Sequence, residues 1–544
     1  MIAKTRDTVI FSLNGQVTKV GGDDAFMTLA EWLRKRALLT GTKIVCAEGD
    51  CGACTVVRGF EPRNSKKKPV FAAMNSCITA VAQMDGSHLV TVEGLKADGE
   101  LAPAQEAMRA CHGSQCGYCT PGFVMAITGA LEVLPNLDRK TAANYLTGNL
   151  CRCTGYSPIL DAAQSVVRSP KHSLAARYLS PTIVKQLRDL TNIPLEVRGS
   201  HLGSSHLGSK TNTTAENNRP VFYAPTTLLE ACKAAAKNKN ARLVAAATDV
   251  GVQVNKGKAL APFIISLQHL AELYTVLSKG TSLLVGARVN LTQLRSAVAK
   301  SIPEFAKFLD IFASPQIKNV ATLVGNLANA SPIGDTLPFL LATNAVVHTA
   351  RYAQGKINRR KISIQDFFIA YKKLALASGE IITAVEIPTG KPFRNLRLYK
   401  VSQRKDLDIS AVSAALNIDV STSGKISAAS LAFGGVAATP IRLGKVERYL
   451  IGKAPSHELF DAARAMIDSQ LMPLSDARGS DIYRRVLIAN IFQRYVHTTL
   501  GTPAGASSLG PCRLTDELIN SDASSGPANT QKAFTSHIAT GGPS

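Results

Sequence analysis

Eight of the eleven cysteines fall into two sets, and the first set has a spacing that suits an iron–sulfur cluster. Cys46, Cys51 and Cys54 lie in the stretch CAEGDCGAC, and Cys77 follows after 22 intervening residues. This Cys-x4-Cys-x2-Cys…Cys order is the plant-type spacing for a [2Fe–2S] cluster, in which two irons each take two thiolates. Zinc sites favour paired Cys-x2–4-Cys knuckles instead. The spacing therefore predicts a [2Fe–2S] cluster.

The second set is Cys116, Cys119, Cys151 and Cys153, with 31 residues between its two pairs. Its spacing alone leaves zinc and an iron–sulfur cluster open, because four thiolates suit either, although Cys-x-Cys is tight for a zinc knuckle. The [2Fe–2S] cluster predicted for the first set favours an iron–sulfur cluster at the second set as well, because one-electron centres are useful in chains. The remaining cysteines lie outside any ligand spacing and are expected to be small buried or free thiols: Cys111, Cys232 and Cys512.

Short-range signals indicate the elements that position the first set. Residues 9–13 and 16–20 are strand-like and flank Asn14-Gly15, a strong hairpin signal. Thr28 and Glu31 fit a capping box at the start of a helix, and the cysteine loop follows that helix. The sequence therefore predicts a small β-rich domain over residues 1–84.

Residues 85–169 are predicted to form a helical domain. Thr120-Pro121 and Ser157-Pro158 each open a helix, with a good N-cap residue type before a proline in the first turn. Each opening follows a cysteine pair. Both pairs therefore lie at helix N-termini, where free N–H groups and the positive end of the helix dipole favour an anionic ligand set.

The rest of the chain divides by composition. A linker is predicted over 170–219, where Ser, Gly and Asn dominate from residue 199 and HLGS occurs twice. An α/β pattern then runs over 220–395 and an α+β pattern over 396–502. The Gly-, Ser- and Pro-rich tail, 503–544, is expected to be disordered. The predicted fold class is multidomain α+β.

Composition and charge exclude several function classes. No apolar run reaches the length of a membrane span, and the first residues lack the features of a signal peptide, so we expect a cytoplasmic protein without a membrane segment. In a reducing compartment, cysteines serve metals or catalysis more often than disulfides. The net charge is +23, but the basic residues are scattered and no nucleic-acid-binding motif accompanies them. A solvated surface or an acidic partner subunit is expected instead.

The cysteine motifs CAEGDCGAC, HGSQCGYCTPG and GNLCRCTGY resemble those of the molybdenum hydroxylases, and within them the xanthine dehydrogenases. The resemblance implies a β-grasp ferredoxin domain and a four-helix domain. The first would bind a [2Fe–2S] cluster through Cys46, Cys51, Cys54 and Cys77. The second would bind another through Cys116, Cys119, Cys151 and Cys153. It also implies that Gln115 lies near a molybdopterin.

The flavin half carries the same resemblance. LVAAATDVG and SPQIKNVATLVGNLANASPIGDTLPFLLA resemble the two flavin-binding turns of the vanillyl-alcohol-oxidase-like FAD fold. YKVSQRKDLDISAV and AFGGVAATP resemble later segments, including a C-terminal flavoprotein domain. No Rossmann G-x-G-x-x-G occurs, in keeping with another scaffold for the flavin. The implied FAD contacts are Leu243, Val244, Ala245, Ala246, Ala247, Thr248, Asp249, Val250, Phe312, Thr322, Leu323, Val324, Gly325, Asn326, Asp335, Ile382 and Lys400.

Two positions depart from the family pattern. The family usually has glycine where this chain has Ala246, and Gly-Gly where it has Val324-Gly325. A β-branched valine strongly resists positive φ, so residue 324 is expected at negative φ with its side chain directed away from the flavin. Ala246 adds only a methyl group. FAD is therefore expected to bind.

The resemblance implies the small subunit of a xanthine dehydrogenase, with no catalytic residues in this chain. Hypoxanthine or xanthine would be oxidised to urate at molybdopterin on a large subunit, within a heterotetramer. Electrons would pass through the helical cluster, the ferredoxin-like cluster and FAD to NAD. The chain is expected to end before any molybdenum domain. The alternatives are a related molybdenum hydroxylase acting on an aldehyde or another N-heterocycle, a flavin-free electron-transfer subunit, and a zinc-binding nucleic-acid adapter. Oxygen or ferredoxin could replace NAD as acceptor.

Overall fold

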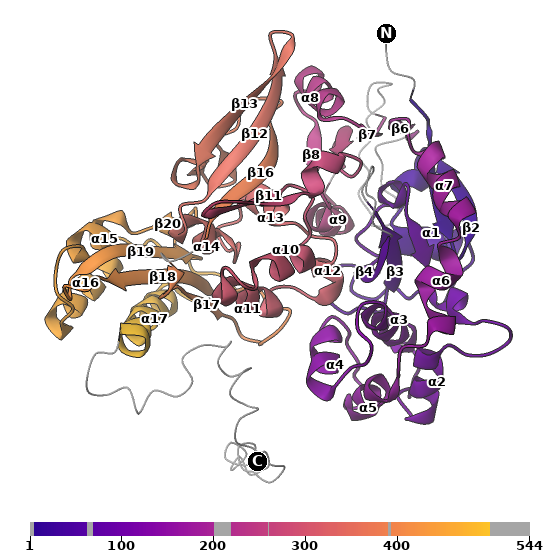
Figure 1. The fold of residues 1–544 in the computed structure, drawn as a ribbon, viewed down its shortest axis with the longest axis horizontal. Coiled ribbons are helices and arrows are strands. Elements are labelled where there is room, and N and C mark those ends of the chain that lie inside the picture. Colours follow the sequence, from indigo (N-terminus) through magenta and orange to yellow (C-terminus); the bar gives the residue numbers. More distant parts are fainter. Residues whose placement is uncertain (1–4, 62–68, 201–218, 259, 390–392, 501–544) are drawn as a thin grey trace, which may run out of the picture.

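A computed structural model describes residues 5–61, 69–200, 219–258, 260–389 and 393–500. Figure 1 shows the N-terminal domains in indigo and purple on one side and the C-terminal domain in orange and yellow on the other. The predicted disordered tail, the HLGS repeats and Cys512 lie outside the described residues.

The first domain is a five-stranded mixed sheet in the order β2-β1-β5-β3-β4. The predicted hairpin is confirmed: Leu13 pairs with Gln16, and the turn residues Asn14 and Gly15 have φ of 49° and 89°. The predicted cap is also confirmed, because the Thr28 hydroxyl accepts from the Glu31 N–H. The elements are β1 (Thr8–Leu13), β2 (Gln16–Gly21), η1 (Gly22–Phe26), α1 (Leu29–Lys35), β3 (Thr55–Phe60), β4 (Val70–Asn75), η2 (Val81–Met84), β5 (His88–Val90) and η3 (Val92–Leu95).

The second domain is helical, and its central helix packs directly on the first sheet. Its helices are α2 (Pro103–Ala110), α3 (Thr120–Leu131), α4 (Arg139–Tyr145) and α5 (Ser157–Ser165). Gly129 of α3 lies so close to β4 that an added Cβ would meet the Ala73 nitrogen at 2.9 Å. Both predicted proline openings are confirmed. Thr120 and Ser157 were expected as caps, but each is the first helical residue, after Cys119 and Tyr156 respectively. The Thr120 hydroxyl bonds Ser114 instead.

The structure differs from the linker predicted for 170–219. Residues 170–198 contain η4 (Pro170–His172), α6 (Leu174–Tyr178), α7 (Pro181–Leu190) and β6 (Leu195–Arg198). Strand β6 pairs antiparallel with β7 (Val221–Ala224), and Leu195 also bridges Arg6. Apolar residues of this segment drive the difference, since Leu174, Leu187 and Leu195 are buried.

The flavin-side domain contains two larger sheets with helices around them, and a two-stranded sheet of β14 and β15. Strands β7, β9 and β8 run parallel beside β6, and a second, antiparallel sheet has the order β10-β11-β16-β12-β13. After β7, the elements of the flavin-side domain are α8 (Leu228–Lys237), β8 (Arg242–Val244), α9 (Thr248–Asn255), β9 (Phe263–Ser266), η6 (Ala271–Tyr274), β10 (Val276–Lys279), β11 (Ser282–Gly286), α10 (Leu291–Val298), α11 (Pro303–Ile311), α12 (Pro315–Lys318), α13 (Leu323–Asn329), α14 (Leu337–Ala342), β12 (Val346–Ala353), β13 (Lys356–Ser363), η7 (Ile364–Asp366), β14 (Phe368–Ala370), β15 (Lys373–Leu374) and β16 (Ile381–Pro388).

The C-terminal domain is a four-stranded antiparallel sheet in the order β17-β18-β19-β20, packed against three helices. Its elements are β17 (Arg397–Val401), β18 (Val412–Val420), β19 (Ile426–Gly434), β20 (Ile441–Arg442), α15 (Gly444–Leu450), α16 (His457–Ser469) and α17 (Asp481–Leu500). The chain is thus a multidomain α+β protein. Among the described residues, no helix combines the length and the apolar character that crossing a bilayer requires.

Candidate cofactor sites

The first thiol set converges in the loop between α1 and β3 and at the end of β4. Hydrogen bonds join the Cys46 thiol to Cys51 and Cys77, and the Cys54 thiol to Cys77. The Cys46 sulfur also accepts from the Glu48 N–H at 3.4 Å, and Asn75 Nδ2 lies 3.8 Å from the Cys54 sulfur. The four sulfurs thus contact one another in series, Cys51–Cys46–Cys77–Cys54, and four thiolates gathered in this way fit a group in which each of two irons takes two thiolates.

The second thiol set also forms two pairs. The Cys153 and Cys116 sulfurs lie 3.7 Å apart, and the Cys119 thiol bonds Cys151. The first pair is exposed, whereas Cys151 is buried. Among the described residues, no three Cys, His, Asp or Glu side chains gather around a single metal-ion position. The eight predicted ligands nonetheless lie in their two predicted groups, the first as four thiols in series and the second as two pairs.

The thiol pKa values diverge within each set. Hydrogen bonds with Cys51 and Cys77 lower the pKa of Cys46. The hydrogen bond between Cys46 and Cys51 raises the pKa of Cys51. In the second set, burial raises the pKa of Cys119 to about 12. Each pattern is that of thiolates sharing protons in close contact, and a bound metal would take the place of those protons.

The loop of the first thiol set contacts the loop of the second. The Leu150 N–H donates to the Cys51 carbonyl at 2.9 Å, and Asn149 Nδ2 donates to the Gly52 carbonyl at 3.1 Å. Gly52 has φ of 66°, and an added Cβ there would meet the Gly148 carbonyl at 2.2 Å. Only glycine allows this approach. The two thiol sets are therefore held together through backbone contacts.

The same first loop also contacts the flavin side through α9. Asn255 Nδ2 donates to the carbonyls of Ala47 and Cys77 at 2.7 and 2.8 Å. Gly251 of α9 lies against Ile78, where an added Cβ would meet the Ile78 carbonyl at 2.0 Å. Figure 1 shows α9 on the side of its domain that faces the first domain. The first thiol set thus lies between the second set and α9.

The predicted first flavin turn joins β8 to α9. Leu243 and Val244 end the strand, and Ala247, at φ of 57°, precedes the helix without a side-chain cap. The first-turn N–H groups of the helix, over 248–250, therefore have no intrahelical partner. Free N–H groups at a helix N-terminus suit the phosphates of a dinucleotide. The turn fits the pyrophosphate of FAD.

The predicted second flavin turn is the start of α13. The Thr322 hydroxyl accepts from the Gly325 N–H at 2.9 Å, and Asn326 Oδ1 accepts from the Thr336 hydroxyl at 2.7 Å. Val324 is helical and only 4% exposed, within the hydrophobic core. The expectation of negative φ at residue 324 is thus confirmed.

Asp335 and Lys400 form a buried ion pair. Lys400 Nζ lies 2.7 Å from Asp335 Oδ2 and also donates to the Asp408 carbonyl and the Ser410 hydroxyl. The other carboxylate oxygen, Asp335 Oδ1, is buried without a hydrogen-bond partner. A buried acceptor of this kind needs a donor. It fits a hydroxyl or N–H group of a bound flavin cofactor.

Three protein families match the chain along its length. The FAD binding domain in molybdopterin dehydrogenase matches residues 214–390, and the CO dehydrogenase flavoprotein C-terminal domain matches 397–499. The [2Fe-2S] binding domain matches residues 91–164, around the second thiol set.

The chain belongs to the molybdenum hydroxylase family.

Xanthine dehydrogenases are among the curated relatives. That of Emericella nidulans is 32% identical over 549 residues, covering 92% of this chain and 39% of the relative. Xanthine dehydrogenase 1 of Arabidopsis thaliana is 31% identical over 522 residues, covering 87% of this chain and 38% of the relative. The chain therefore spans about two fifths of the length of these relatives.

Two solved structures of the family are also similar to this chain. A Cu,Mo-CO dehydrogenase in its cyanide-inactivated form is 24% identical, with a TM-score of 0.48 over 51% of this chain and 96% of that chain. Quinoline 2-oxidoreductase from Pseudomonas putida 86 is 26% identical, with a TM-score of 0.46 over 51% and 95%. Likenesses at these scores are no basis for choosing a substrate.

Family membership confirms the iron–sulfur and FAD cofactors expected from the sequence. The residue contacts stay predictions. Phe312 stacks on Phe308 and Ile382 lies in β16, both in the core around the flavin turns.

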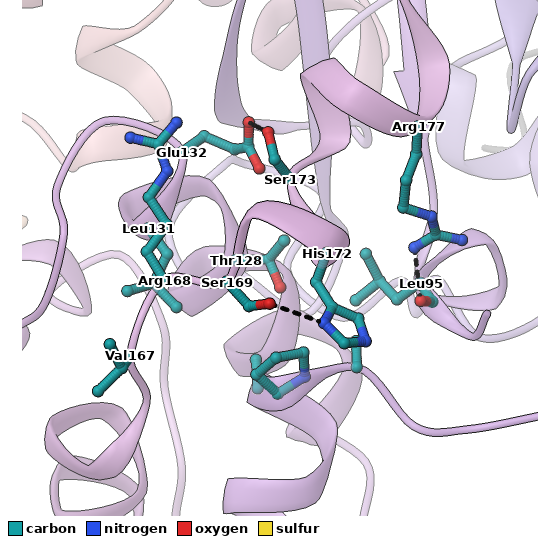
Figure 2. A pocket seen from close by; sticks show the side chains of 13 residues that line it. Leu95, Thr128, Leu131, Glu132, Val167, Arg168, Ser169, His172, Ser173 and Arg177 are labelled. Carbon is teal, nitrogen blue, oxygen red and sulfur yellow. Dashed lines mark hydrogen bonds between the residues drawn. The ribbon is translucent and has the colours of Figure 1, made fainter.

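Two hollows in the described surface lie away from the predicted cofactor residues. Figure 2 shows one in the helical domain, lined by Leu95, Glu132, His172 and Arg177 among others. Two of its charged groups are already bonded within the protein: Glu132 accepts from the Leu174 N–H, and Arg177 donates to backbone carbonyls. The pocket therefore offers little to an FAD or a cluster.

Four buried or half-buried side chains at the molybdenum hydroxylase sites were missed by the sequence reasoning. They are Gln83, Asn255, Arg288 and Gln316. Each bonds a partner more than forty residues away in the chain. No local sequence pattern identifies such residues, because the sequence around a polar side chain does not show whether that side chain faces solvent or another domain.

Proposed function

We propose that this chain is the electron-transfer subunit of a xanthine dehydrogenase. It would hold two [2Fe–2S] clusters and FAD, and work with a separate large subunit whose molybdopterin oxidises hypoxanthine and xanthine to urate. The proposed final acceptor is NAD, and the proposed assembly is a cytoplasmic heterotetramer. Support for the substrate comes from relatives named xanthine dehydrogenase that match about nine tenths of this chain.

The observation that carries the electron-transfer proposal is the position of the first thiol loop. Leu150 and Asn149 contact it from the second thiol set, and Asn255 contacts it from the flavin side. When bound, the clusters supply one-electron steps and FAD couples them to a two-electron acceptor. The part of this chain is to hold the three cofactors in that order.

The surface of the second thiol set supports a partner subunit there. Cys116, Cys153 and Gln115 are exposed, and so are the apolar side chains of Tyr118 and Leu150 at 49% and 62%. Exposed apolar side chains gathered around a redox site are typical of a surface that another protein covers. We propose that the large subunit binds this face and brings its molybdopterin to Gln115.

The test combines cofactor analysis with activity. The purified chain should contain about four irons, as two [2Fe–2S] centres with distinct paramagnetic signals, and one FAD. Cys151→Ser should remove one signal and spare the other. The chain alone should reduce a dye with NADH, and together with its large subunit it should reduce NAD with xanthine.

Other outcomes favour the alternatives. Turnover of an aldehyde or another N-heterocycle, with none of xanthine, would indicate a related molybdenum hydroxylase. Full iron without FAD would indicate a flavin-free subunit, and zinc at the second set would contradict the electron path. Oxidation of xanthine by the chain alone would contradict the division of work between two subunits.

A further inference from the structure

The first flavin turn is contacted by a side chain of the ferredoxin-like domain. Gln83, in η2, donates from Nε2 to the carbonyl of Ala246 at 2.7 Å, and this contact is buried. The other end of the same amide, Oε1, accepts from the Ala80 N–H at 3.0 Å. Ala80 follows the predicted cluster ligand Cys77 by three residues. One amide group therefore joins the cluster side to the flavin side.

Three successive carbonyls of this turn are occupied within the protein. Arg288 donates to Ala245, Gln83 donates to Ala246, and the Gly251 N–H donates to Ala247 at 2.8 Å. A carbonyl oxygen that faced the pyrophosphate would repel it. With these oxygens held by other partners, the N–H groups at the start of α9 remain for the anion.

The turn needs such support because of its backbone conformation. Ala247 lies in the left-handed region at φ of 57°, which residues with a Cβ adopt rarely. Conformations of this kind persist only where the surrounding structure fixes them. Arg288 fixes one side of the turn from its own domain, and Gln83 fixes the other side from the ferredoxin-like domain.

We propose that Gln83 is a positioning residue for FAD, so that the ferredoxin-like domain forms part of the flavin site. The inference rests on the proposed function, in which the turn at 243–250 binds FAD. Its consequence is that FAD affinity depends on this cross-domain hydrogen bond. The cluster of the same domain does not depend on it, because Gln83 lies outside the thiol loop.

The chain offers a matched control for this test. Gln105, at the start of α2, accepts from the Ala102 N–H through Oε1 at 2.9 Å, as Gln83 does from Ala80. Its Nε2 reaches only Val92, within the iron–sulfur half. Glutamate is itself a usual residue at this capping position, so a change to Glu keeps the cap and replaces the Nε2 donor by a carboxylate oxygen, which cannot donate and carries charge.

The experiment measures FAD affinity by flavin fluorescence in full-length Gln83→Glu and Gln105→Glu, alongside iron content and the paramagnetic spectra. Loss of a buried hydrogen bond predicts a dissociation constant for FAD about tenfold higher in Gln83→Glu. Gln105→Glu should bind FAD as the wild type does. Both should keep full iron and both cluster signals.

A second variant at Gln83 tests whether the effect of Gln83→Glu comes from burying a charged carboxylate rather than from losing the Nε2 donor. Gln83→Met keeps the side-chain volume without charge, and should also weaken FAD binding at full iron content. Wild-type affinity in either variant would overturn the inference, as would joint loss of iron and FAD in both. A wild-type chain with full iron that binds no FAD would instead overturn the flavin part of the proposed function, and this inference with it.

Discussion

At the scale of single residues, the two departures from the family pattern have different consequences. The family pattern described from the sequence has glycine at the positions of Ala246 and Val324. Neither residue has positive φ, and Val324 is buried in the core at the start of α13. Valine therefore fills space beneath the second flavin turn. The backbone conformation at residue 324 therefore does not require glycine in this chain.

Val324→Gly should therefore destabilise the protein without improving FAD binding. The variant loses a buried side chain and gains backbone freedom inside a helix, for a cost of about 3 kcal/mol. Chemical denaturation, followed by the release of flavin, would measure this loss of unfolding free energy. Val420→Gly, at the C-terminal end of β18 with 39% exposure, is the control and should cost less. Tighter FAD binding by Val324→Gly would show that the valine obstructs the flavin.

The buried ion pair between Lys400 and Asp335 gives a second prediction at this scale. Lys400→Met leaves the Asp335 carboxylate buried without its cation, which should cost about 3–5 kcal/mol and weaken FAD binding. The exposed pair between Arg295 and Asp310 is the control, and Arg295→Met should cost less than about 1 kcal/mol. Equal effects of the two variants on unfolding would contradict the role given to burial.

At the scale of elements, three domains meet where α12, β3 and the loop before Cys151 come together. Gln316 Nε2 donates to Asn149 Oδ1 at 2.7 Å, and Asn149 in turn contacts Gly52 and Thr55. All of these polar side chains are buried. Gln316 Oε1 is buried without a hydrogen-bond partner, but the bonds that Gln316 Nε2 and Asn149 make join elements of all three domains. Buried hydrogen bonds of this kind hold the elements that carry them in one arrangement.

Gly148→Ala tests this junction. An added Cβ would meet Gln316 Oε1 at 2.0 Å and the Ser314 Cβ at 2.8 Å, so α12 and the second thiol loop must separate. We expect a loss of about 1–3 kcal/mol in unfolding free energy, with both cluster signals present but a weaker magnetic interaction between them. Gly444→Ala, where the nearest atom is an arginine tip at 3.4 Å, is the control. An unchanged interaction would show that the junction does not set the distance between the clusters.

Elements with local signals were predictable from the sequence, and elements with distant partners were not. The β1–β2 hairpin, the Thr28 cap and the proline openings of α3 and α5 depend on neighbouring residues, and all are present. Strand β6 was missed because it forms by pairing with β7, which follows residues 201–218 in the sequence, so no local pattern marks it. The cysteine sets were predictable because ligand spacing is itself a local signal.

At the scale of the whole molecule, a buried charge cluster joins the first domain to the flavin-side domain. Asp85 accepts from Arg6 and lies 2.6 Å from His269 Nε2, and it also accepts from the Ile10 N–H. Burial alone would raise the pKa of Asp85, but hydrogen bonds from His269 and the charge of Arg6 lower it from 3.8 to about 2. The ionised carboxylate is thus the form that holds the two domains together.

This shift predicts how stability depends on pH. The pKa of Asp85 is lower in the folded protein, so its contribution is present above about pH 3.8 and is lost as the pH falls toward about 2. The shift corresponds to about 2 kcal/mol. Asp85→Asn should be less stable than the wild type at pH 7, and the difference between them should narrow by about that amount below pH 4.

The measurement is the difference in unfolding free energy between wild type and Asp85→Asn across this range, so that cluster loss common to both proteins cancels. Asp161→Asn, which breaks an exposed ion pair with Arg139, is the control and should show a small difference. Because Asp85 joins two domains, its variant should also increase hydrogen exchange in η2 and in the segment around His269 together. A difference that stays constant from pH 7 to pH 2, or exchange that rises in the first domain alone, would show that the Asp85 carboxylate does not hold the domains together.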